Sequence, residues 1–71
     1  MRRAILEALK ARYEAEIAEA DATANIYLEN SVGIGEHPQH IDEVNKQVVK
    51  IAAAREKLEV LDQFEPEKAV L

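Results

Sequence analysis

The chain has 71 residues, with 14 acidic and 9 basic side chains and a formal net charge of −5. It contains no cysteine, which excludes a disulfide framework and a thiolate metal site. Charged residues, Glu7 and Lys10 among them, interrupt every apolar stretch before it is long enough for a membrane span or a secretory signal. The excess of acidic residues disfavours binding to nucleic acid. We therefore expect one small cytoplasmic domain.

Residues 2 to about 31 are predicted to form one helix. The stretch contains neither proline nor glycine, and alanine, glutamate and leucine, which favour helices, dominate it. Its larger apolar residues advance by threes and fours, as one face of a helix requires. This face consists of Leu6, Leu9, Tyr13, Ile17, Ala20, Ala24 and Tyr27 or Leu28.

A corner over residues 32–37 is predicted to separate this helix from the next. Gly33 is placed to close the first helix in the left-handed conformation, and Gly35 permits a second unusual backbone angle. Pro38 suits the first position of a new helix because its φ angle is fixed and it has no N–H to satisfy. We therefore interpret the two glycines and Pro38 as a structural turn.

The second helix is predicted to run from about residue 38 to 64. Pro66 ends it, because the residue before a proline avoids the helical conformation, and residues 65–71 form a loose tail. Its predicted packing face advances by threes and fours and consists of Ile41, Val44, Val48, Ile51, Arg55, Leu58 and Leu61.

Two long helices joined by a short connection predict an all-α fold, an antiparallel helical hairpin. The charges agree, since the basic start of the first helix then meets the acidic end of the second. We expect Ile17 to pack against Ile51 and Leu28 to lie near Ile41. Arg55 is expected opposite Tyr13, with its stem packed and its head stacking on the ring or meeting Glu14 or Glu16; the alternative is a partner-binding or anion-binding group.

A second apolar face predicts self-association. Two helices form a single layer, and a buried core needs packed elements on both sides, so a homodimer forming a four-helix bundle is the expected closed solution. The alternative interpretation is that alanine is simply a good exposed helix former. The predicted interface consists of Ile5, Ala8, Ala15, Ala22, Ile26, Val49, Ala53 and Val60.

A metal site is the weaker interpretation of the residues around the corner. Glu36, His37 and His40 carry ligand atoms at close spacing, and a partner subunit can complete such a site. The favoured interpretation is a polar turn whose side chains lie in water. Serine and threonine occur once each, so no catalytic set can be assembled, and we expect a protein that is not an enzyme and uses no cofactor.

The corner carries a resemblance to a known group of proteins. The segment Val-Gly-Ile-Gly-Glu-His-Pro at residues 32–38 and the segment Lys-Leu-Glu-Val-Leu at residues 57–61 resemble small uncharacterised helical-hairpin proteins of tailed marine and cyanobacterial phages. The resemblance implies a viral source and no activity.

These patterns together predict a non-enzymatic module for protein–protein interaction or assembly. Its partner is a second copy of the chain, or another viral or host protein. One alternative is a small regulator that binds a host protein through an apolar or acidic helix face. The other is a metal-binding bundle that uses His37, His40 and Glu36.

Overall fold

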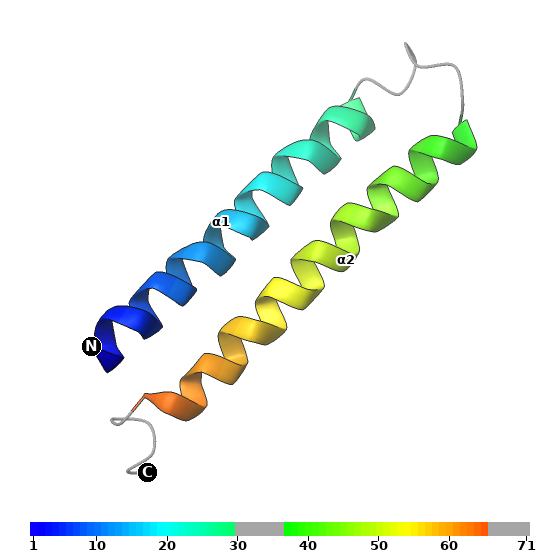
Figure 1. Ribbon diagram of the computed structural model, residues 1–71. Helices are drawn as coiled ribbons and strands as arrows, with labels where there is room; N and C mark the ends of the chain where they lie inside the picture. The colour runs from blue at the N-terminus through cyan, green and yellow to red at the C-terminus, as the bar shows by residue number, and fades with distance from the viewer. Residues whose placement is uncertain (30–36, 66–71) are drawn as a thin grey trace.

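Two long antiparallel helices make up the fold. The computed structural model describes residues 1–29 and 37–65, with only the backbone described for residues 37 and 38. Helix α1 spans Arg2–Glu29 and helix α2 spans His37–Leu61, and they lie side by side (Figure 1) in a particle of 53 × 20 × 14 Å. The prediction of an all-α antiparallel hairpin is confirmed.

The start of α1 is hydrogen-bonded to the C-terminal end of the second helical segment, which lies beside it. The Ile5 N–H donates to the carbonyl oxygen of Met1 at 3.1 Å and closes the first helical turn. The first turn holds no acidic residue, although acids there would favour the helix dipole. Arg2 instead donates from Nη2 to the carbonyl oxygen of Phe64, so its cation serves the carboxyl end of the opposite helix.

The end of α2 tightens before the chain turns away. Residues Asp62–Phe64 form a short 3₁₀ turn, η2, and the Glu65 N–H donates to the carbonyl oxygen of Asp62 at 3.2 Å. Glu65 itself is extended, with φ −86° and ψ 118°, as expected of a residue that precedes a proline. The predicted corner, with Gly33 and Gly35, lies outside the described residues, so its expected backbone angles stay a prediction.

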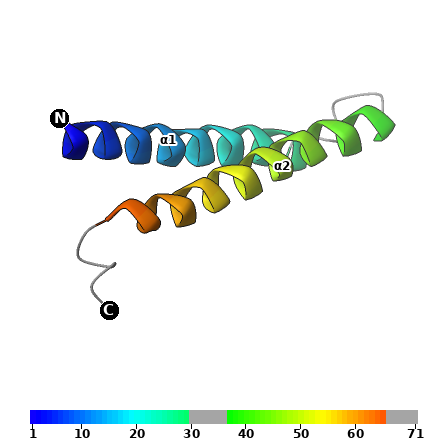
Figure 2. The same cartoon turned by 60° about the horizontal axis from the view of Figure 1, so that its bottom comes forward.

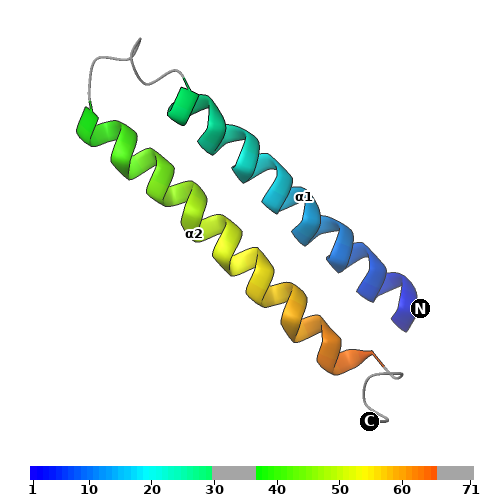
Figure 3. The same ribbon diagram turned by 180° about the vertical axis from the view of Figure 1, so that it is seen from behind.

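Two aromatic contacts define the register between the helices. The rings of Tyr27 and His40 have centroids 5.9 Å apart, and Nζ of Lys57 lies 5.4 Å from the ring centroid of Tyr13. The first contact joins residues near the connected ends of the helices and the second joins residues nearer their other ends, as an antiparallel hairpin requires. The view from behind shows the same side-by-side arrangement (Figure 3), and the turned view shows that the two axes cross (Figure 2).

The face of α2 that packs on α1 departs from the predicted face at three of seven positions; the other four are half-buried, namely Val44, Ile51, Leu58 and Leu61. Ile41 and Val48 were expected in the seam, yet they are 70% and 54% exposed. The buried residues are their chain neighbours His40, Gln47 and Ala54, at 7%, 7% and 0% exposure. At three positions, seven residues apart, the buried residue of α2 is therefore the one that precedes the predicted residue.

Side-chain volume explains the displacement. Counting along both helices from the Tyr27–His40 contact places Tyr13 near the level of Ala54 and Ala20 near the level of Gln47. Both of these levels pair a large side chain with a small one, which allows the helices to pack closely. Hydrophobicity alone favours the neighbouring row of α2, because that row is richer in branched apolar residues.

Arg55 belongs to the displaced row and leaves its predicted place. It is exposed, and Lys57 is the cation that lies over the Tyr13 ring. Arg55 instead lines a surface hollow with Lys10 and Glu14 of α1. Arg55 therefore does not occupy the seam opposite Tyr13, but it shares a hollow with Glu14, one of the two acids that its head was expected to meet.

The buried core of the hairpin is made of small and polar side chains. Among the described residues, the buried apolar ones are Ala20, Ala24 and Ala54, and no large side chain is fully buried. Ile17 and Ile51, predicted to face each other, are both half-buried. The hairpin by itself therefore removes little large apolar surface from water.

Enlarging Ala54 tests the seam. We expect Ala54→Leu to lower the free energy of unfolding by about 1–3 kcal/mol, because the added atoms have no space at the level of Tyr13. The exposed control Ala52→Leu is expected to change it by less than about 0.5 kcal/mol. Urea denaturation at one fixed protein concentration measures both, and equal effects of the two substitutions would contradict the seam described above.

Candidate interaction face

One flank of the hairpin exposes apolar side chains from both helices near their connected ends. Leu28 of α1 lies beside Ile41 and Val44 of α2, with which it lines a shallow hollow, as predicted for Leu28 and Ile41. Leu28 is 63% exposed, and Val48, two turns further along α2, is about half exposed. We call Leu28, Ile41, Val44 and Val48 the apolar face.

The same flank is charged toward the other end of the hairpin. Helical geometry places Lys10 and Leu28 on one side of α1, because they are five full turns apart, and the same holds for Ile41 and Glu59 on α2. A second hollow lies here, which we call the charged half. It is lined by Lys10, Glu14, Arg55, Leu58, Glu59, Leu61, Asp62 and Glu65.

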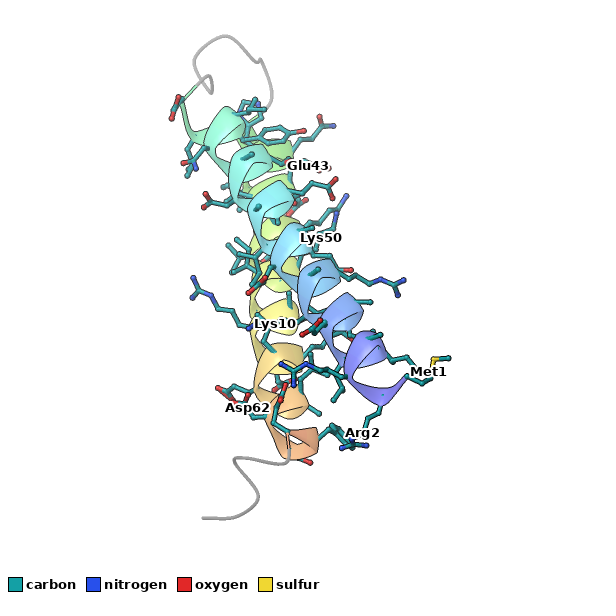
Figure 4. All side chains as sticks on the ribbon, turned by 90° about the vertical axis from the view of Figure 1, so that its left-hand side faces the viewer. Met1, Arg2, Lys10, Glu43, Lys50 and Asp62 are labelled. Atoms are coloured by element: carbon teal, nitrogen blue, oxygen red, sulfur yellow. The ribbon has the colours of Figure 1, made fainter. Side chains whose placement is uncertain are left out.

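The opposite flank of the hairpin has a different character. Figure 4 shows Lys10 and Asp62 projecting to one side of the helix pair, and Glu43 and Lys50 projecting to the other. On this second side α1 contributes acids and α2 contributes lysines to one hollow. Its lining consists of Glu16, Glu19, Val49, Lys50, Ala53 and Lys57.

An ion pair on α2 accounts for a shifted lysine. Nζ of Lys46 donates to Oε1 of Glu43 at 3.0 Å, and this hydrogen bond raises the pKa of Lys46 above its ordinary value of 10.5. Because the pKa of Lys46 is higher in the folded chain than in the unfolded chain, the ion pair contributes its full stabilisation below pH 10.5. This stabilisation is lost only as the pH rises through the pKa of Lys46 in the folded chain. This pair lies within α2, and the ion pair Arg3–Glu7, at 3.4 Å, lies within α1.

The predicted interface residues lie on the outside of the hairpin. On the second flank, Val49 and Ala53 share a hollow with Glu16 and Glu19 of α1. Ala53 is half-buried and the others are exposed: Ile5, Ala8, Ala15, Ala22, Ile26, Val49 and Val60. On the apolar face, by contrast, Leu28 of α1 and Ile41 and Val44 of α2 line one hollow.

The position of His40 differs from the expectation. The sequence suggested a side chain in water on a polar turn, but the ring is buried and packs at a tilt of 59° against Tyr27. Between residues 1–29 and 37–65, no group of three or more histidine, cysteine, aspartate or glutamate residues is arranged to hold a metal ion. Glu36 and the side chain of His37 lie outside the described residues, so the metal interpretation stays a prediction.

Comparison with known proteins adds no further identification. No family model matches the chain, and no curated protein or solved structure is significantly similar to it. Neither helix, over the residues described, has the length and apolar character needed to cross a bilayer. The arguments about function therefore rest on the surfaces of the hairpin.

Truncating His40 tests its role in packing. We expect His40→Ala to lower the free energy of unfolding by about 2 kcal/mol, because it leaves a void against the Tyr27 ring. The control Gln39→Ala changes an exposed side chain one residue away and is expected to cost less than about 0.5 kcal/mol. Thermal and urea unfolding measure both. A Zn²⁺-dependent rise in melting temperature that His40→Ala abolishes would contradict a packing role and support a metal site.

Proposed function

We propose that the chain is a non-enzymatic assembly module that acts by self-association. Two hairpins pair through the apolar face and form a four-helix bundle, a homodimer in the cytoplasm. The observation that carries this proposal is the contrast between the two surfaces of α2. Its seam buries His40, Gln47 and Ala54, whereas Ile41 and Val48 remain largely in water.

The energetic argument starts from what a lone hairpin lacks. Below about 70–80 residues a single hydrophobic core rarely supplies more than about 3–5 kcal/mol, and this chain has no cysteine to form a stabilising disulfide. Burying the exposed parts of Leu28, Ile41 and Val48 contributes on the order of 1 kcal/mol for each side chain. A symmetric dimer gains this contribution twice, since both copies present the same face.

The source of the chain is part of the same proposal. The resemblance of residues 32–38 to small phage proteins supports a viral source, with the module acting in the cytoplasm of the host. Helical assembly modules need no catalytic residues, in agreement with the scarcity of nucleophilic side chains in this sequence.

Two neighbouring valines provide a matched test of self-association. Val48 and Val49 are 54% and 57% exposed, but Val48 belongs to the apolar face and Val49 to the other flank. We expect Val48→Glu to weaken the dimer roughly 100-fold, because the carboxylate loses water without gaining a partner. Val49→Glu is expected to change the dissociation constant less than about threefold. Sedimentation equilibrium measures both.

Each contrary outcome favours a specific alternative. If the wild-type chain is monomeric up to about 100 µM, self-association is wrong and the apolar face belongs to a regulator that binds another protein. If Val49→Glu dissociates the dimer and Val48→Glu does not, the interface is the originally predicted one, which includes Val49, Ala53 and Val60.

A further inference from the structure

We propose that the two hairpins of the dimer are parallel to each other. Their connected ends lie together, a two-fold axis runs along the bundle, and α1 of each chain lies over α2 of the other. This inference rests on the proposed function and adds to it the orientation and the residues that select it. A second copy of this chain is thus the occupant of the apolar face.

The division of the flank into two halves supports this orientation. The apolar face lies near the connected ends, and the charged half lies near the other ends. A parallel pair brings apolar against apolar and charged against charged along the full length of both hairpins. A fully overlapped antiparallel pair would place Leu28 and Ile41 against the partner's charges, which would lose water without apolar or ionic compensation.

The order of charges supports the same orientation independently. A two-fold axis along the bundle does not shift residues along the bundle. Each residue of α1 therefore faces the same positions of the partner's α2 that it faces on α2 of its own chain. Glu14 then faces Arg55 of the partner subunit, and Lys10 faces Glu59 of the partner subunit. All four of these residues line a single hollow within one chain, so the heights follow from the register of the hairpin.

The resulting layers have alternating charge. At the level of Glu14 and Arg55, two acids and two bases alternate around the axis, and the level of Lys10 and Glu59 repeats the pattern. Like charges lie on the diagonals, where repulsion is weakest, and each ion faces a group of opposite sign on the partner. A partner of unrelated sequence does not supply this order, so the charged half selects a second copy.

Mixing two charge-reversed chains tests the intermolecular contacts alone. Glu14→Arg in one chain and Arg55→Glu in another each place like charges together, both within the chain and in its own homodimer. In the mixed dimer every contact between chains is complementary again, whereas the repulsion within each chain is unchanged. We expect the mixed dimer to form about tenfold more tightly than either homodimer, because exposed charge pairs each contribute a fraction of a kcal/mol to about 1 kcal/mol.

Native mass spectrometry of the two chains, mixed at equal concentration, measures the proportions. Heterodimer in excess of the statistical half of all dimers supports the parallel arrangement. Statistical proportions overturn it, since an antiparallel pair places Glu14 and Arg55 of different chains too far apart to interact.

A spin label measures the orientation without altering any charge of the interface. Gln63 is exposed near the end of the hairpin, and the chain has no native cysteine, so Gln63→Cys carries a single label. A parallel dimer places the two labels within roughly 30 Å, the width of a helical bundle. An antiparallel dimer separates them by about the 53 Å length of the hairpin or more.

Pulsed dipolar spectroscopy on the labelled dimer distinguishes these cases. A short distance supports the inference, and a long distance in a chain that still dimerises overturns the orientation while leaving the proposed function intact. A monomeric wild-type chain overturns both.

Discussion

A pair of helices has only one seam, and the rest of the structure depends on that constraint. Each helix turns one side to its neighbour and the remainder to water, so large side chains cannot be covered from all directions. The described core accordingly consists of Ala20, Ala24 and Ala54 with two polar residues, His40 and Gln47. Alanine permits close approach of the helices, whereas bulky residues such as Ile17 and Ile51 are only partly covered.

The contents of the seam decide the character of the outer surface. Because α2 turns His40, Gln47 and Ala54 inward, it necessarily turns Ile41, Val48 and Arg55 toward one flank. The apolar face and the charged half are thus consequences of how the hairpin itself packs. Because His40 packs against Tyr27 in the seam, its neighbour Ile41 lies on the surface through which we propose that the chain assembles.

Electrostatics contributes orientation more than stability. The exposed ion pairs Arg3–Glu7 and Lys46–Glu43 join residues within one helix and stabilise it only slightly. The bond from Arg2 to the Phe64 carbonyl has a different role, because it places a cation at the carboxyl end of the neighbouring helix. The same distribution of charges that favours an antiparallel hairpin also produces alternating layers when two hairpins are parallel.

The sequence by itself determined the helices, their antiparallel arrangement and the extended conformation of Glu65, whereas α2 ends at Leu61 and the predicted last turn is the 3₁₀ turn Asp62–Phe64. Composition and apolar spacing specify a helix locally, a short connection leaves two long helices little choice of direction, and Pro66 forces Glu65 into an extended conformation. Tertiary structure alone decided which row of α2 enters the seam. The rows containing His40 and Ile41 have the same seven-residue repeat and differ by a rotation of about 100°. The choice between them depends on the volumes of the α1 side chains at each level, such as Tyr13 beside Ala54, and these levels exist only once the helices are paired.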